Sequence, residues 1–348
     1  MKQKVLITRE VFPDCVERLR AHFDVEINES GAAYSPQELI RRASDKDGIL
    51  TLADPITAAL IDAAPALKAV STVSVGYNHL DIAAFNKRGI IATNTPGVLD
   101  ETTADLAWAL LMATARRITE AEQVLRAGEW QEWRYDMLTG SDIYGATLGI
   151  IGMGRIGQAI ARRAQGFNMR VLYNNRSRVA ADIESALGAE WVDKEALLRS
   201  ADHIVLVLPY TPQSHHTIGA REIALMKPTA NLINIARGGI VDDVALIDAL
   251  REKRIGGAGL DVFENEPALN PGFLPLKNVV LTPHIGSASV PTRRAMSNLA
   301  IDNLMAALGV GPHAGQPPNV VNPEALSSGA SGTLGTSGTS LSSGVARS

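Results

Sequence analysis

Three polar side chains each follow an apolar stretch of chain, where the carboxyl end of a strand is expected: Arg237, Glu266 and His284. An arginine offers two parallel donors that match a carboxylate. A histidine exchanges its proton near neutral pH, and a carboxylate beside it favours the charged imidazolium. Together these groups could bind a 2-keto acid, polarise its ketone and protonate the carbonyl oxygen during a reduction. Each residue alone is more often structural, so the prediction depends on the set.

A glycine-rich turn is the second chemical feature, because residues 148–157 read Leu-Gly-Ile-Ile-Gly-Met-Gly-Arg-Ile-Gly. In the spacing Gly152-x-Gly154-x-x-Gly157, the first glycine permits a tight turn and the second lets the backbone approach a pyrophosphate. The third lets the following helix pack closely on the strand. An apolar strand precedes the turn and a helical stretch follows it. The pattern therefore predicts a dinucleotide-binding unit, with an ordinary βα turn as the alternative.

The end of the next strand indicates which dinucleotide binds. An acidic residue about 20 positions after the first glycine is typical of NAD binding, because it bonds the ribose hydroxyl. Here residues 173–178 read Tyr-Asn-Asn-Arg-Ser-Arg, with two cations, two amides and a hydroxyl in its place. Such groups suit a 2′-phosphate, so we predict NADP(H) in preference to NAD(H), with a solvated basic turn as the alternative. The residues expected to contact it are Asn174, Asn175, Arg176 and Ser177.

Short β-branched runs alternate with helical stretches from the N-terminus onward, which predicts parallel sheets with helices on both faces. The first series has strands at 4–8, 25–27, 48–52, 69–72 and 90–92, and helices at 15–22, 36–43, 57–63 and 81–87. A long helix at 100–127 and an irregular segment to about 146 are expected next. The second series has strands at 147–151, 170–173, 190–192, 203–208, 231–234, 256–260 and 279–281, before a last helix at 290–308.

The glycine turn comes late in the chain, with roughly 145 residues before it, which indicates that another domain forms first. We predict an α/β protein with two doubly wound parallel sheets: a Rossmann cofactor domain, 99–285, inserted into a flavodoxin-like substrate domain, 1–98 plus 286–326. The site is expected in the cleft between them, beyond the carboxyl ends of the strands. Residues 327–348 are mostly Ser, Gly and Thr and are expected to form a disordered tail.

Composition excludes several classes of protein. Hydrophobic residues make up 46% of the chain and charged residues 20%, as in soluble globular proteins. No apolar run is long enough to span a bilayer and no signal peptide is evident, so a cytoplasmic location without membrane contact is expected. The single cysteine, Cys15, excludes an internal disulfide. The net charge of −4 disfavours nucleic acid as a partner. His215-His216 has no further ligand nearby and is interpreted as part of a loop rather than a metal site.

Four segments together resemble the D-isomer-specific 2-hydroxyacid dehydrogenase family. They are the glycine turn, Asn-Ile-Ala-Arg-Gly at 234–238, Gly-Leu-Asp-Val-Phe-Glu-Asn-Glu-Pro at 259–267, and Pro-His-Ile-Gly at 283–286. The resemblance covers residues 1 to about 324. Within the family the chain is similar to the glyoxylate/hydroxypyruvate reductases, also described as 2-ketogluconate reductases. That similarity is carried by Ser-Val-Gly-Tyr-Asn at 74–78, Gly-Glu-Trp at 128–130, Gly-Phe-Asn-Met at 166–169 and the basic strand end.

The resemblance implies the reduction of small 2-keto acids to D-2-hydroxy acids. Arg237 would bind the substrate and polarise its ketone, His284 would donate the proton, and Glu266 would hold His284. The backbone of Val75 and Gly76 would bind the substrate carboxylate. The family also implies a homodimer formed through the cofactor domain, at about 100–145. Contacts with the dinucleotide are implied for Gly152, Gly154, Arg155, Ile156, Gly157, Leu208, Pro209, Ile235, Asp261 and Ser287.

Two other kinds of function fit the same residues. One is a non-catalytic dinucleotide sensor or corepressor on this architecture, which would bind NADPH without turnover and associate with a protein partner. The other is an NAD-dependent dehydrogenase of a different 2-hydroxy acid, such as a 3-phosphoglycerate-type enzyme. That enzyme would call for a regulatory domain or an NAD preference, and neither is visible in the sequence.

Overall fold

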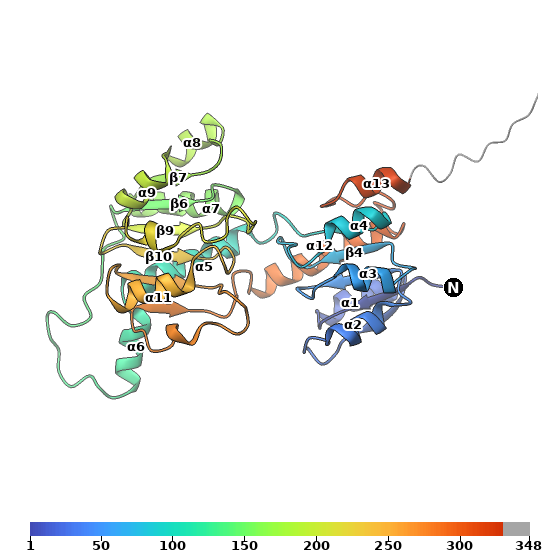
Figure 1. The fold of residues 1–348 in the computed structure, drawn as a ribbon, viewed down its shortest axis with the longest axis horizontal. Helices are drawn as coiled ribbons and strands as arrows, with labels where there is room; N and C mark the ends of the chain where they lie inside the picture. Colours follow the sequence, from blue (N-terminus) through green and yellow to red (C-terminus); the bar gives the residue numbers. More distant parts are fainter. Residues whose placement is uncertain (330–348) are drawn as a thin grey trace, which may run out of the picture. The chain divides into compact units, whose positions relative to one another are not determined.

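The computed structural model describes residues 1–329 of the 348-residue chain. Two compact units make up the described chain: residues 1–96 with the residues from Arg294 onward form unit 1, and Gly97–Arg293 form unit 2. Unit 2 is therefore an insertion into the chain of unit 1, which can be followed by colour in Figure 1. The sequence predicts the two crossings near 98 and 286. In the structure the second crossing lies within helix α12, Val290–Ala307.

Unit 1 is built on a parallel sheet in the order β2-β1-β3-β4-β5, an order typical of flavodoxin-like folds. Helix starts follow local capping chemistry: the Ser35 hydroxyl accepts a hydrogen bond from the backbone N–H of Glu38, just before Pro36. The strands are β1 (Lys4–Ile7), β2 (Asp24–Ile27), β3 (Gly48–Thr51), β4 (Ala69–Thr72) and β5 (Ile91–Thr93). The helices are α1 (Pro13–Arg20), α2 (Pro36–Ala43), α3 (Ala58–Ala63), α4 (Ile82–Arg88) and α13 (Glu324–Gly329).

Unit 2 contains a larger parallel sheet in the order β12-β11-β10-β9-β6-β7-β8. Numbered from β6, this is the Rossmann order 3-2-1-4-5-6 with β12 added at one edge. The predicted architecture of two doubly wound sheets is therefore confirmed. The strands are β6 (Thr147–Ile151), β7 (Arg170–Asn174), β8 (Ala189–Trp191), β9 (His203–Leu206), β10 (Asn231–Asn234), β11 (Gly257–Leu260) and β12 (Val279–Leu281).

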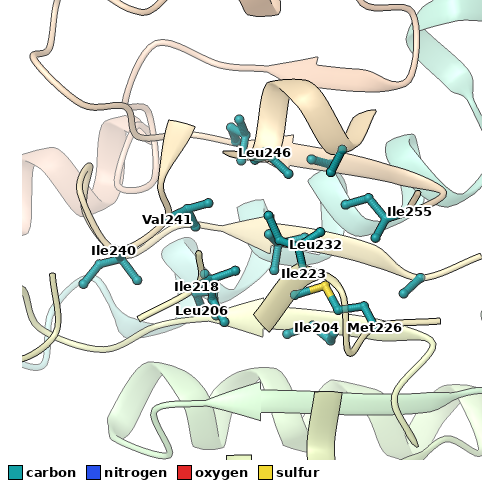
Figure 2. Close-up of a cluster of buried hydrophobic side chains, with 14 of the residues drawn as sticks. Ile204, Leu206, Ile218, Ile223, Met226, Leu232, Ile240, Val241, Leu246 and Ile255 are labelled. Carbon is teal, nitrogen blue, oxygen red and sulfur yellow. The ribbon is translucent and has the colours of Figure 1, made fainter. Parts of the chain in front are cut away.

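Two apolar clusters lie on opposite faces of this sheet, which is why its strands are hydrophobic along their whole length. One face is covered by α5 and α7, and the other by α9, α10 and α11; Figure 2 shows part of the second cluster. The helices are α5 (Asp100–Ala115), α6 (Ile118–Arg126), α7 (Arg155–Ala164), α8 (Ala181–Leu187), α9 (Lys194–Ser200), α10 (Ala220–Ile223) and α11 (Asp243–Arg251). Short 3-10 turns are at Gln165–Phe167 and Pro271–Phe273.

The prediction of one continuous helix over 100–127 is wrong. The helix stops at Ala115 and a second begins at Ile118, because Arg117 adopts a left-handed backbone conformation with φ of +51°. The chain returns to this break: the backbone N–H of Ser141 donates to the Ala115 carbonyl at 2.9 Å, which satisfies the end of α5. Helix α5 is buried in the sheet's core, whereas α6 buries no residue.

At the C-terminus the predicted tail starts too early. Helix α13 runs through Gly329, so residues 327–329 form its last turn instead of beginning a disordered segment. The remainder of that predicted tail, 330–348, lies outside the described residues.

Candidate active site

The glycine turn joins β6 to α7, and each glycine has a distinct steric reason. Gly152 has φ of +109°, and a Cβ there would lie 2.6 Å from the Val207 carbonyl oxygen. A Cβ on Gly157 would lie 2.2 Å from the carbonyl oxygen of Gly152. Gly154 instead faces open space, with no atom within 4 Å of its Cβ position. The protein's own packing therefore requires the outer two glycines, while the middle one leaves room for a ligand.

This turn lies where the strand order of the sheet reverses, between β6 and β9. Ligands of doubly wound sheets bind at such switch points, beyond the carboxyl ends of the strands. Helix α7 begins at Arg155 after Gly154, and no side chain caps its N-terminus. The first backbone N–H groups of a helix lack partners within the helix and attract anions. The open space at Gly154 and this uncapped helix end fit a pyrophosphate, with Arg155 exposed and Ile156 partly buried beside it.

The two asparagines after β7 have partners within the protein. The Asn174 amide donates to the Val192 carbonyl at 2.8 Å. The Asn175 side-chain oxygen accepts a hydrogen bond of 2.7 Å from the backbone N–H of Met153, inside the glycine turn. Both side chains thus brace the strand end and the turn. Their predicted contact with the cofactor stays a prediction.

The basic residues that follow differ in their pairing. Arg178 forms an ion pair of 2.7 Å with Glu184, which also hydrogen-bonds to the Tyr173 hydroxyl. Arg176 and Ser177 are exposed and their side chains bond to none of the residues in 1–329. One of the two predicted cations is therefore neutralised by α8, and Arg176 is the charge left available to a ligand.

The remaining predicted contacts lie at the carboxyl edges of neighbouring strands. Leu208 and Pro209 follow β9, Ile235 follows β10, and Ser287 follows β12. Ile235 is buried, Leu208 and Ser287 are partly exposed, and Pro209 is exposed. The sheet order brings these positions to the same edge as the glycine turn.

Asp261 organises the turn that carries His284. It is buried, and one carboxylate oxygen accepts hydrogen bonds from the Thr282 hydroxyl at 2.6 Å and the Ile285 N–H at 2.8 Å. The other oxygen accepts from the Gly286 N–H at 2.8 Å. Burial raises the pKa of Asp261, although these hydrogen bonds act in the opposite direction. The residue therefore has a structural task in addition to the cofactor contact that the sequence predicts.

The predicted acid and its carboxylate are in contact. The Nδ1 atom of His284 lies 2.7 Å from Oε2 of Glu266, and the second oxygen of Glu266 accepts from the Phe263 N–H at 2.8 Å. Burial raises the pKa of the Glu266 carboxyl, but the hydrogen bond and charge of His284, together with the Phe263 N–H and Arg237, outweigh it, and the pKa is lowered overall. The Nε2 atom of His284 bonds to none of the residues in 1–329, and the side chain is 47% exposed.

Arg237 follows β10 and is partly buried. Its guanidinium donates to the carbonyl oxygen of Ala236 at 2.7 Å, and the Asn234 amide donates to the Arg237 carbonyl at 3.3 Å. Burial lowers the pKa of Arg237, and the charge of Glu266 opposes this shift. The side chain keeps its charge at any ordinary pH, with donors free for a carboxylate or a ketone. Arg237, Glu266 and His284 thus come together within unit 2, as the sequence predicts.

Val75 and Gly76 lie in unit 1, in the loop after β4. The carbonyl of Val75 accepts from the Asn94 amide at 2.8 Å, and that of Gly76 accepts from the Ser74 hydroxyl at 2.6 Å. The Ser74 hydroxyl is in turn 2.8 Å from that of Thr72. The loop's carbonyls are therefore held by the protein, whereas neither N–H of Val75 and Gly76 bonds to a residue in the described part of the chain. Unpaired backbone donors of this kind suit a carboxylate.

Comparison with known proteins decides the family. Residues 108–286 match the model of the D-isomer specific 2-hydroxyacid dehydrogenase, NAD binding domain. The chain is 48% identical over 331 residues to a glyoxylate reductase from Thermococcus onnurineus, covering 94% of this chain and 98% of that protein. The chain belongs to the D-isomer-specific 2-hydroxyacid dehydrogenase family. It is an NAD(P)-dependent oxidoreductase, as the sequence predicts.

Solved structures of this dehydrogenase family share the fold. A D-isomer specific 2-hydroxyacid dehydrogenase from Polaromonas sp., described as putative, has a TM-score of 0.85 and 38% identity, covering 92% of this chain and 100% of that one. An NADPH-dependent glyoxylate/hydroxypyruvate reductase from Sinorhizobium meliloti, in complex with citrate, has a TM-score of 0.80 and 35% identity. That match covers 92% of this chain and 99% of the other.

Two features of this dehydrogenase could not be predicted from its sequence. His216 pairs with Glu264, 48 positions away in the chain, and no local spacing could have revealed the contact. A cavity of about 160 Å³ in unit 1 is lined by Arg9, Tyr34, Asp54 and mostly apolar side chains, none of which was a predicted site residue.

Within residues 1–329, no cluster of side chains suited to a metal ion is found, and no helix is long and apolar enough to cross a bilayer.

Proposed function

We propose that this dehydrogenase reduces glyoxylate, hydroxypyruvate and 2-ketogluconate to the corresponding D-2-hydroxy acids, with a preference for NADPH. The observation that carries the proposal is the 2.7 Å contact between His284 and Glu266. The charge of Arg237 acts in the same direction as this contact, since it also lowers the pKa of Glu266. Support also comes from the name of the Thermococcus relative, a glyoxylate reductase, and from the NADPH-dependent Sinorhizobium enzyme.

Each residue has a role that follows from its chemistry. When bound at the glycine turn, the dinucleotide supplies the hydride. His284 donates a proton from Nε2 to the carbonyl oxygen, while Glu266 fixes the ring through Nδ1 and stabilises its charge. Arg237 pairs with the substrate carboxylate and polarises the ketone. In unit 1, the backbone N–H groups of Val75 and Gly76, which bond to none of the residues in 1–329, are proposed donors for a carboxylate.

The preference for NADPH is proposed from the end of β7. A 2′-phosphate carries charge that needs a cation, and Arg176 has no partner among the described residues. Ser177 adds a hydroxyl donor beside it, and residues 173–178 contain no carboxylate to bond a ribose hydroxyl. Arg178 contributes less than the sequence suggests, because Glu184 already neutralises it.

We also propose that the enzyme is a homodimer formed through about residues 100–145. Large apolar side chains are exposed on α6 and the following loop, including Leu125 (59%), Trp133 (74%) and Tyr135 (89%). Figure 1 shows α6 and this loop extending from the body of unit 2. A second copy would bury these groups, which water solvates poorly. Light scattering should give twice the chain mass, and Trp133→Ser with Leu125→Ser should shift it toward monomer; a monomeric wild type would refute the proposal.

The decisive experiment is a kcat/KM panel over glyoxylate, hydroxypyruvate, 2-ketogluconate and pyruvate, each with NADPH and NADH. We expect turnover of at least one of the first three, favouring NADPH. The product should be the D isomer wherever it is chiral. His284→Ala is the matched control, since it removes the proton donor but leaves the glycine turn intact. A wild type inactive with glyoxylate, hydroxypyruvate and 2-ketogluconate would overturn the proposal, and a preference for NADH would overturn its cofactor assignment.

A further inference from the structure

Three loops of unit 2 converge on His216. His216 lies in the segment after β9, and its backbone N–H donates to the Gly239 carbonyl in the loop after β10 at 2.7 Å. Its Nε2 atom lies 2.6 Å from Oε1 of Glu264, in the loop after β11. The other ring nitrogen is 3.9 Å from Asp242 at the start of α11. His216 therefore links the carboxyl-edge loops of three neighbouring strands, through its backbone N–H to the loop after β10 and through its side chain to the loop after β11.

Those loops carry the proposed catalytic groups. Arg237 is two residues before Gly239, and Glu266 is two residues after Glu264. The loops are in direct contact, because a Cβ on Gly238 would lie 1.8 Å from the Phe263 carbonyl oxygen. A movement of Glu264 would therefore displace the segment whose Phe263 N–H and Glu266 carboxylate are hydrogen-bonded to each other.

The surroundings of His216 restrict its position further. The His215 ring stacks on it with centroids 3.8 Å apart, and the Tyr210 hydroxyl is 3.2 Å from His215 Nδ1. The charged groups that face His216 are Glu264, Asp242 and the buried Asp243, whose oxygen accepts from the Glu264 N–H at 3.2 Å. Burial raises the pKa of Asp243 to about 6, with Glu264 and Asp242 adding to the shift.

We propose that His216 and Glu264 are positioning residues. They fix the loops that carry Arg237 and Glu266 relative to each other, so that Glu266 stays hydrogen-bonded to His284. This inference rests on the proposed function of that site. The pair is partly exposed, at 36% and 28% of its side chains, and ion pairs in such places stabilise folds by only about 0 to 1 kcal/mol. Its effect should therefore appear in the geometry of the catalytic groups more than in global stability.

The test compares His216→Phe, which removes the donor, with His216→Gln, whose amide can still donate to Glu264. Lys227→Gln is the control, because Lys227 forms a 2.8 Å ion pair with Asp202 of similar exposure. That pair lies before β9 and β10, away from the carboxyl-edge loops. Measurements are kcat, KM for each substrate, NADPH affinity by fluorescence, melting temperature, and the NMR chemical shift of the imidazole signal that His284→Ala abolishes.

We expect His216→Phe to lower kcat roughly 3- to 30-fold while NADPH affinity and melting temperature change little. The NMR chemical shift of the His284 ring should change, because Glu266 no longer stays beside the ring. His216→Gln should recover most of the loss, and Lys227→Gln should match wild type. An active wild type whose His216→Phe variant keeps its kcat and its His284 chemical shift would overturn this inference alone. An inactive wild type would instead refute the proposed function, and the His284 chemical shift would still test the positioning role.

Discussion

Replacing Glu266 by glutamine should impair the proposed proton donor more than the loss of one charge suggests. In the structure one oxygen of Glu266 accepts from the Phe263 N–H and the other faces His284 Nδ1. An amide has only one oxygen, and the Phe263 N–H requires that it point toward Phe263. The NH₂ group would then face Nδ1, which could no longer carry a proton itself, and the imidazolium would be disfavoured.

The size of this effect follows from two contributions. Opposite charges about 4 Å apart interact by about 1 kcal/mol in water and about 4 kcal/mol near a protein surface. Because 47% of the His284 side chain is exposed, solvent screening places the lost attraction at about 1 to 2 kcal/mol. The misplaced donor adds about 1 kcal/mol. A total of about 2 to 3 kcal/mol corresponds to a roughly 30- to 150-fold lower kcat/KM near neutral pH.

The assay is kcat/KM for glyoxylate from about pH 5 to 10, at saturating NADPH. Reduction needs a charged imidazole, so the alkaline loss of activity should begin at lower pH in Glu266→Gln than in wild type. Glu266→Ala removes the charge without placing a donor at Nδ1, so its alkaline loss should lie between the two. The reasoning would be refuted by a glutamine variant that keeps more than about a third of wild-type kcat/KM at pH 7 and loses activity at the same alkaline pH as wild type.

Acid stability provides an independent readout of the same contact. The pKa of Glu266 is lower in the folded protein than its ordinary value, so ionised Glu266 stabilises the fold above that ordinary value. This contribution is lost as the pH falls through the lowered pKa of the folded state. The free energy of unfolding of Glu266→Gln should therefore decline less on the acid side than that of wild type, as urea denaturation at several pH values would show.

Three further predictions concern individual side chains. Gly154→Ala should keep the melting temperature and raise the KM for NADPH, whereas Gly157→Ala, with a Cβ 2.2 Å from a backbone oxygen, should lower the melting temperature by several degrees. Arg176→Ala should reduce kcat/KM with NADPH about tenfold or more and leave NADH nearly unchanged; equal losses with both would contradict its assignment to the 2′-phosphate. Asp261→Asn should cost about 1 to 3 kcal/mol of stability, because an NH₂ group must face a donor among Thr282, Ile285 and Gly286; an unchanged urea midpoint would argue against this network.

The sheets could be predicted from sequence because their signal is local. A fully buried parallel strand reads as a short run of Val, Ile and Leu, and in β6, β10 and β12 the expected bounds agree with the structure. Helix α5 and α6 read as one element because nothing in residues 100–127 breaks the helical composition. The break at Arg117 is stabilised by Ser141, which lies on a returning segment that a local pattern does not contain.

In the candidate site, too, some residues could be predicted from local sequence and others could not. Arg237, Glu266 and His284 could be found from sequence because each follows a recognisable strand, and parallel strands bring their carboxyl ends to one edge. The residues that fix the loops around these side chains could not be predicted from the sequence, because their hydrogen-bond partners are distant in the chain. Asn175, which the sequence predicts to contact the cofactor, also bonds to the glycine turn, and His216, predicted to lie in a loop, is paired there with Glu264. The residues proposed to contact substrate can thus be recognised by their positions after strands, whereas the residues that hold them are defined by contacts between loops. For this dehydrogenase, the loops after β9, β10 and β11 are therefore where substitutions could change turnover without touching a substrate or cofactor atom.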